Sequence, residues 1–174
     1  INPNEFGSLL YDYQELDGVL HILFEKKIFR YATRKISVVD RFEKEVCKYL
    51  NIKFALGLNN GTSALRSALH AVGVKPQQRV LITAYTFVAT AASVATLNAI
   101  PVPIDIDLQT GLDINSLEEE VKKGCAAIVL VHLQGRSFDI SSVLKLAAKY
   151  SLPVIEDACQ AFGAQFGDRH TGCL

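Results

Sequence analysis

The sequence has no methionine and no long run of basic residues. It begins at Ile1, so we expect that it is not a complete reading frame, and no charged, apolar and small-residue signal peptide opens it. We therefore expect a cytoplasmic protein. Eighteen basic residues balance eighteen acidic ones, and the basic residues form only short pairs such as Lys26-Lys27. This balance argues against a nucleic-acid-binding or membrane-surface protein.

The four cysteines lie too far apart in the sequence for the close pairs of a zinc site or a redox motif. They are Cys47, Cys125, Cys159 and Cys173. We expect free buried thiols in a reducing cytoplasm and no metal site. The Gly-x-Gly-x-x-Gly and Gly-Lys-Ser/Thr loops are also absent, so a nucleotide- or dinucleotide-binding α/β domain remains only as an alternative without its usual fingerprints.

No charged residue occurs from Leu81 to Ile104, which is long enough for a membrane span to be considered. Threonine, serine, asparagine and proline residues interrupt this stretch. We therefore expect a buried strand, a helix rich in small residues and a second strand, and no membrane partner.

Apolar runs and helical spacings alternate along most of the chain. Residues 1–35 have a partial helical spacing and predict an N-terminal helical arm. Asp40, with Glu43 three residues later, is expected to cap a helix that lies against the sheet. The strands are expected at 54–58, 79–83, 101–105, 126–131 and near 154–155, each followed by a helix or a turn. This order predicts an α/β fold with a mostly parallel sheet and right-handed crossovers.

The polar turn Asn59-Asn60-Gly61-Thr62-Ser63 separates an expected strand from an expected helix. Backbone N–H groups at such a helix start are unpaired, and the helix dipole lies behind them, so the turn could hold a phosphate. The alternative is that Thr62 or Ser63 only caps the helix.

The stretch 154–160 places Asp157 and Gln160 just where an apolar run ends. Parallel strands deliver such side chains to a crevice at their carboxyl ends. The alternative is that Asp157 only caps the next segment. Phe87 leaves an earlier strand end and could stack on a flat ring, although an aromatic there is more often core.

Tyr85 and His132 follow two further strands and are candidate substrate contacts. A lone histidine at such a position is more often a hydrogen-bonded structural residue than a catalyst.

A phosphate cradle, an aromatic face and a carboxylate at neighbouring strand ends describe a site for pyridoxal phosphate. A carboxylate such as Asp157 keeps the pyridine nitrogen protonated, so that the ring can act as an electron sink. Gln160 could hydrogen-bond the phenolic oxygen of the ring, and Phe87 could stack on its face.

Six stretches also resemble the DegT/DnrJ-type sugar aminotransferases, which are fold-type-I pyridoxal-phosphate enzymes. The resemblance covers roughly residues 35–174 and is carried by Phe42-Glu43, 60–65, 85–90, 103–107, 131–135 and 156–164. It implies a three-layer α/β/α fold. It also implies that Thr62 and Ser63 hold the phosphate, Phe87 stacks, Asp157 pairs with the pyridine nitrogen and Gln160 contacts the phenolic oxygen.

The resemblance further implies that residues 36–174 are the N-terminal portion of a pyridoxal-phosphate-binding large domain. The Schiff-base lysine and the small C-terminal domain of such proteins would lie beyond Leu174, so the fragment alone is expected to be inactive. The implied activity of the parent protein is transfer of an amino group from glutamate or glutamine to a keto sugar nucleotide, in a homodimer. Two alternatives stay open: a sugar dehydratase of the same family, and a non-catalytic regulatory or interaction protein on the same fold.

Overall fold

The computed structural model describes residues 11–26, 28 and 37–174. The chain divides into two compact units, Ile1–Gly57 and Leu58–Leu174. Within the described residues, no helix is both long enough and apolar enough to cross a membrane.

The described residues of the first unit form two helices, each with a capping box. Helix α1 (Tyr13–Phe24) lies in the expected N-terminal arm, and its N-cap is Asp12. The remainder of that arm, residues 1–10, 27 and 29–35, lies outside the described residues.

Helix α2 (Val38–Leu50) begins earlier than expected, because Ser37 rather than Asp40 is its N-cap. The Ser37 hydroxyl accepts the Asp40 N–H at 3.1 Å, and the Asp40 carboxylate accepts the Ser37 N–H at 2.9 Å. The prediction of an Asp40 cap was therefore wrong by one turn. Glu43 has a different role, since its carboxylate accepts the Gly57 N–H at 2.6 Å.

Residues 54–58 were expected to form a strand, but they form none within the described residues. Their apolar side chains Phe54, Leu56 and Leu58 are 77, 65 and 43% exposed. A strand requires a hydrogen-bonded neighbour. The described part of the chain supplies no such neighbour for this run, so the apolar pattern alone was misleading.

The second unit is built on a parallel sheet with the strand order β2-β1-β3-β4. The strands are β1 (Arg79–Thr83), β2 (Ile100–Ile104), β3 (Ala127–Val131) and β4 (Val154–Asp157). Pro101 and Pro103 lie in β2 at one edge of the sheet, where a missing N–H costs no ladder bond on the outer side. Two prolines in a short run predict either an edge strand or a strand start, and the structure shows an edge strand.

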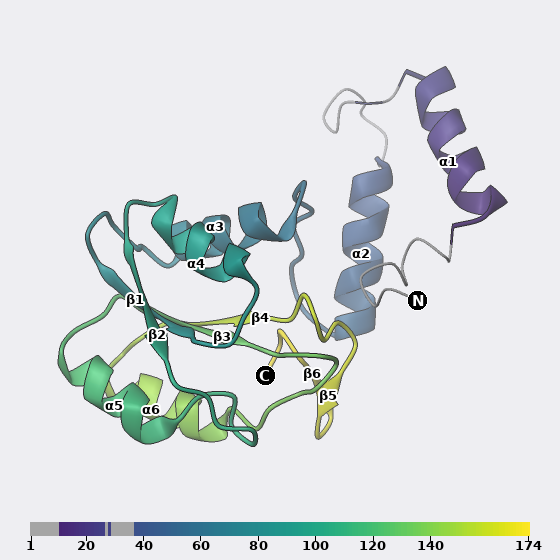
Figure 1. The fold of residues 1–174 in the computed structure, drawn as a ribbon. Coiled ribbons are helices and arrows are strands. Elements are labelled where there is room, and N and C mark those ends of the chain that lie inside the picture. The colour runs from purple at the N-terminus through teal and green to yellow at the C-terminus, as the bar shows by residue number, and fades with distance from the viewer. Residues whose placement is uncertain (1–10, 27, 29–36) are drawn as a thin grey trace. The chain divides into compact units, whose positions relative to one another are not determined.

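Helices cover both faces of this sheet (Figure 1). Helices α3 (Gly61–Ala71) and α4 (Val88–Ala95) pack on one face around Leu69, Ile82 and Val94. Helices α5 (Ile114–Lys122) and α6 (Ser141–Lys149) pack on the other face around Leu117, Leu130 and Val143. The predicted three-layer α/β/α fold with a parallel sheet is confirmed, and the uncharged stretch 81–104 forms β1, α4 and β2 as expected.

After β4 the chain makes a short antiparallel hairpin that the sequence did not suggest. It consists of β5 (Gln165–Phe166) and β6 (Arg169–His170), and it turns at Gly167, whose φ is +59°. Only glycine adopts such a backbone conformation without cost. The chain then returns to β4 through residues 171–174.

Candidate functional site

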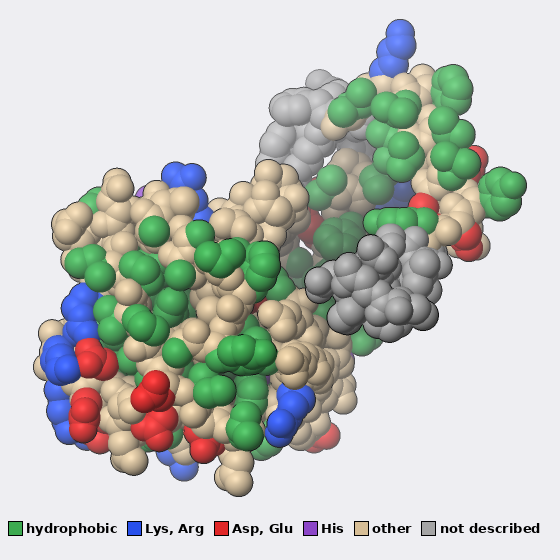
Figure 2. All heavy atoms as spheres, in the orientation of Figure 1, with side chains coloured by type: hydrophobic (Ala, Val, Ile, Leu, Met, Phe, Trp, Pro, Cys, Tyr) green, Lys and Arg blue, Asp and Glu red, His purple; other side chains and the backbone are tan. Residues whose placement is uncertain are grey.

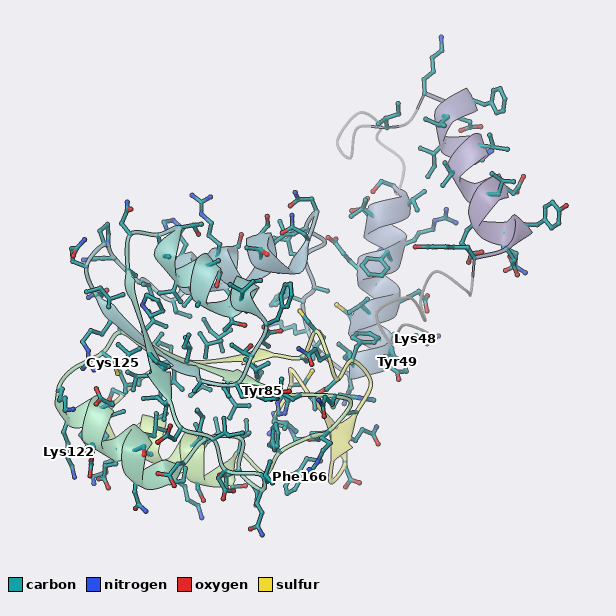
Figure 3. The ribbon with its side chains drawn as sticks, viewed as in Figure 1. Lys48, Tyr49, Tyr85, Lys122, Cys125 and Phe166 are labelled. Carbon is teal, nitrogen blue, oxygen red and sulfur yellow. The ribbon has the colours of Figure 1, made fainter. Side chains whose placement is uncertain are left out.

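The carboxyl ends of β1, β3 and β4 lie at one edge of the parallel sheet, and a cavity of about 190 Å³ lies there. Its walls are made by Tyr85, Thr86, Phe87, Leu133 and Gln160. Figure 3 shows Tyr85 at this edge and Cys125 at the opposite, amino edge. The structure therefore brings Tyr85, Phe87 and Gln160 together at these strand ends.

Asp157 ends β4 and is only 7% exposed. One carboxylate oxygen accepts the Thr90 hydroxyl at 3.2 Å, and the other accepts the Cys159 N–H at 3.1 Å. Thr90 is itself hydrogen-bonded to the Thr86 hydroxyl at 2.9 Å. No cation among the described residues pairs with this carboxylate. Because a buried carboxylate is costly without a positive partner, the arrangement suits a cationic ligand.

The expected phosphate cradle opens helix α3, but its cap is Asn60 rather than Thr62 or Ser63. The Asn60 side chain accepts the Ser63 N–H at 2.8 Å. The N–H groups of Gly61 and Thr62 have no hydrogen-bond partner among the described residues, so these two donors remain available to an anion.

Gly61 brings this helix start close to the Asp157 turn. A Cβ atom added to Gly61 would lie 3.1 Å from the Cys159 sulfur. This contact is tighter than ordinary packing, so the glycine allows the two segments to approach each other. The anion donors and the buried carboxylate therefore lie on neighbouring segments of one unit.

Phe87 and Tyr85 present their rings to solvent. Phe87 is the N-cap residue of α4 and is 67% exposed, and Tyr85 is 58% exposed. The alternative that Phe87 is a core aromatic is therefore wrong in this structure. Gln160 is also exposed, while its backbone carbonyl accepts the Gly135 N–H at 2.8 Å. This bond ties the loop after β3 to the turn after β4.

His132 lies at the end of β3 and is fully buried. Its Nδ1 accepts the Phe138 N–H at 3.3 Å, so the proton is on Nε2, which lies 2.9 Å from a Glu156 oxygen. This is the geometry of the hydrogen-bonded structural histidine that the sequence favoured.

The thiol of Cys159 is kept protonated at this site. Cys159 is an exposed residue rather than the buried one expected, but partial desolvation of its thiol raises its pKa to about 11, with a further contribution from the hydrogen bond to the Asp157 carboxylate. Such a thiol is a weak nucleophile at neutral pH. We therefore assign it a packing role beside Gly61.

Two contributors to the site were not identified from the sequence. Thr90 lies 67 residues from Asp157, and nothing in its own neighbourhood indicates the bond between them. Asn60 could have been found, because an asparagine directly before a predicted helix is a strong N-cap signal.

Comparison with known proteins identifies the family of this chain. The model of the DegT/DnrJ/EryC1/StrS aminotransferase family matches residues 29–174. The chain is 40% identical over 147 residues to a GDP-perosamine synthase of Caulobacter vibrioides, covering 82% of this chain and 40% of that protein. It is 39% identical over 137 residues to a pleiotropic regulatory protein of Geobacillus stearothermophilus, covering 78% of this chain and 37% of that protein.

A solved structure agrees with the fold. NtdA from Bacillus subtilis, with bound cofactor PMP, superposes with a TM-score of 0.74 at 31% identity, covering 88% of this chain and 35% of that one. The chain thus spans about two fifths of the length of the curated relatives it matches.

Proposed function

Because the chain belongs to the DegT/DnrJ/EryC1/StrS aminotransferase family, we propose that it is the N-terminal portion of a pyridoxal-phosphate-binding large domain, residues 36–174. The whole protein would transfer an amino group from glutamate or glutamine to a keto sugar nucleotide. Sugar aminotransferases among the relatives support this proposal, including the GDP-perosamine synthase.

The observation that carries the proposal is the buried carboxylate of Asp157. It is held by the Thr90 hydroxyl and the Cys159 N–H, but it has no cationic partner among the described residues. A protonated pyridine nitrogen would supply that partner, and the carboxylate would keep it protonated in return. Pyridoxal phosphate, when bound, supplies an electron sink for carbanion chemistry.

The remaining residues of the site fit the same cofactor. The free N–H groups of Gly61 and Thr62, with the helix dipole behind them and the hydroxyls of Thr62 and Ser63 beside them, would bind its phosphate. The exposed ring of Phe87 would stack on its face. Gln160, which lines the cavity, would donate to its phenolic oxygen.

A lysine is also required for covalent attachment, and no lysine among the described residues lines the cavity. We propose that it comes from outside residues 1–174. Tyr85 lines the cavity and is the candidate contact for the sugar, whereas the buried His132 would act on a substrate only through its neighbours.

We further propose that the protein works in the cytoplasm as a homodimer. The side chain of Phe162 is 66% exposed, two residues after the cavity-lining Gln160, and is the kind of apolar surface that a second subunit covers. Sedimentation of the protein produced from its full reading frame should give twice the monomer mass.

The test uses the protein produced from its full reading frame, with pyridoxal phosphate, glutamate or glutamine, and a nucleoside-diphosphate 4-keto sugar. An amino sugar detected by mass spectrometry supports the proposal. A product that has lost water without gaining nitrogen identifies a dehydratase instead. No change in the absorption spectrum after addition of pyridoxal phosphate would overturn the enzyme assignment and favour a regulatory or interaction protein.

A further inference from the structure

The carboxylate of Glu156 collects three hydrogen-bond donors at the end of β4. His132 Nε2 lies 2.9 Å from one oxygen, which also accepts the Gly172 N–H at 3.0 Å. The other oxygen accepts the Leu174 N–H at 2.9 Å. The side chain of Glu156 is only 10% exposed, and that of His132 is fully buried. One carboxylate thus joins the ends of β3 and β4 to the segment that follows β6.

His132 orients this carboxylate. Its Nδ1 accepts the Phe138 N–H, and its ring stacks on the Phe138 ring with centroids 6.0 Å apart and planes 19° apart. The imidazole is therefore fixed as the tautomer that carries its proton on Nε2 and donates it to Glu156.

The segment held by Glu156 packs behind the turn that carries the site. The Thr171 hydroxyl donates to the Ala161 carbonyl at 2.6 Å, and the Thr171 N–H donates to the Ala164 carbonyl at 2.9 Å. A Cβ atom on Gly172 would lie 3.5 Å from the Cβ of Ala158, which is ordinary van der Waals contact. Residues 171–174 therefore support residues 158–161 from behind.

Glu156 and Asp157 are consecutive strand residues, so their side chains point to opposite faces of the sheet. Asp157 reaches Thr90 on α4, whereas Glu156 reaches His132, whose stacking partner Phe138 belongs to the core under α5 and α6. Glu156 can therefore steady the end of β4 without touching a ligand that Asp157 binds.

We propose that Glu156, oriented by His132, is a positioning residue that holds residues 171–174 behind the turn 157–160. We call the hydrogen bonds from His132, Gly172 and Leu174 to the Glu156 carboxylate the clamp, and this clamp fixes the orientation of Asp157 and Gln160. The effect of the clamp on cofactor binding rests on the proposed function, whereas the existence of the clamp does not.

Three substitutions in the protein produced from its full reading frame test separately whether the clamp exists and whether it affects cofactor binding. Glu156→Gln replaces one acceptor oxygen with an NH₂ group, so at least one of the three donors faces another donor. His132→Gln retains a donor near the Nε2 position, and His132→Asn retains only an acceptor near the Nδ1 position. The matched control is Glu118→Gln, which removes a partly exposed carboxylate that accepts hydrogen bonds from Lys149 and Tyr150 on the helix layer.

Two measurements are made on each protein: hydrogen exchange of the peptide that contains residues 171–174, and the Kd of pyridoxamine phosphate, which needs no lysine. Glu156→Gln and His132→Asn should each raise the exchange rate and weaken binding about tenfold, the effect of losing a hydrogen bond to a charged group. His132→Gln should keep the exchange rate and the Kd close to those of the unsubstituted protein, because it retains the donor. Glu118→Gln should change neither quantity.

Unchanged exchange in Glu156→Gln would overturn the clamp. Faster exchange with unchanged affinity would overturn the positioning role and leave the clamp as a purely structural device. If the unsubstituted protein does not bind pyridoxamine phosphate at all, the proposed function fails, and the exchange data still decide whether the clamp exists.

Discussion

At the amino edge of the sheet, Arg79 donates to the carbonyl oxygens of Glu120 and Gly124 and pairs with the Glu120 carboxylate. At the carboxyl edge, Asp157 is buried and has no cation beside it among the described residues. Of the Glu120 and Asp157 carboxylates, only that of Glu120 has a cationic partner among the described residues.

The charged side chains of α5 and α6 extend the pattern of the amino edge. Figure 2 shows acidic and basic side chains interspersed over these two helices. Lys149 donates to Glu118 at 2.9 Å and, with Lys122, lowers the pKa of that carboxyl group. These groups satisfy one another at the surface, so they contribute modestly to stability and need no ligand.

The difference between the carboxylate of Glu120, which has a cationic partner, and that of Asp157, which has none among the described residues, shows which polar residues indicate function. A carboxylate that is already paired explains its own presence. Asp157 is a buried carboxylate that is held by hydrogen bonds from the Thr90 hydroxyl and from the N–H and thiol of Cys159, and it is stable only if something else compensates its charge. The carboxyl edge is therefore the place to perturb first.

The largest effect is expected for Asp157→Asn, which removes the charge but retains an acceptor for Thr90. The Kd of pyridoxamine phosphate should rise about 100-fold, as for the loss of one partner of a buried charge pair. The binding isotherm measures this change. Asp105→Asn is the matched control, because Asp105 follows β2 at the same edge but is exposed. Equal losses in both variants would contradict the special role of Asp157.

The next effect concerns Cys159, whose pKa is raised to about 11. In the folded protein at pH 8 its alkylation by iodoacetamide should be about 100-fold slower than in denaturant, because the thiolate population falls tenfold for each pKa unit. Peptide mass spectrometry measures the rate.

The raised pKa of Cys159 also determines how the free energy of unfolding changes with pH. The unfolded state loses this proton first, near its ordinary pKa of 9, so the contribution to stability is complete below pH 9 and is lost as the pH rises towards 11. Alkylation at equal rates in the folded and unfolded protein would show that Cys159 is not held against Asp157.

A smaller effect is expected for Gly61→Ala. The new Cβ would lie 3.1 Å from the Cys159 sulfur, so it should push the helix start away from the Asp157 turn and weaken pyridoxamine phosphate binding about tenfold. The double variant Gly61→Ala/Cys159→Ala removes the sulfur and should recover most of the affinity. No recovery would mean that the two segments are not in contact.

The smallest effect is expected at the amino edge. Arg79→Ala removes two bonds to the end of α5 and one ion pair, and it should lower the free energy of unfolding by about 1 kcal/mol. Urea unfolding measures this change. The Kd of pyridoxamine phosphate should not change, and a tenfold change would remove the distinction between the two edges.

The order of strands and helices in the second unit could be predicted from the sequence because apolar runs, such as the uninterrupted one of β3, alternate with helical spacings and polar turns. The segment 54–58 has the same apolar character, yet it forms no strand here, because pairing depends on a neighbour that its own sequence does not specify. The cap of α2 was misassigned because Ser37 and Asp40 are both good cap residues and only the structure shows which accepts from which.

The candidate site was predicted in part for a similar reason. Strand ends indicate where Tyr85, Phe87, Asp157 and Gln160 lie, since parallel strands end at one edge. Burial and long-range partners are not encoded locally. The bond from Thr90 to Asp157, the exposure of Phe87 and the enclosure of His132 by Glu156 and Phe138 depend on how distant segments pack.

The most direct test of the central claim is a crystal structure of the protein from its full reading frame with pyridoxal phosphate. We predict the pyridine nitrogen within hydrogen-bond distance of the Asp157 carboxylate, the ring on Phe87 and the phosphate at the N–H groups of Gly61 and Thr62. A cofactor bound with Asp157 still lacking a cationic partner would contradict the account.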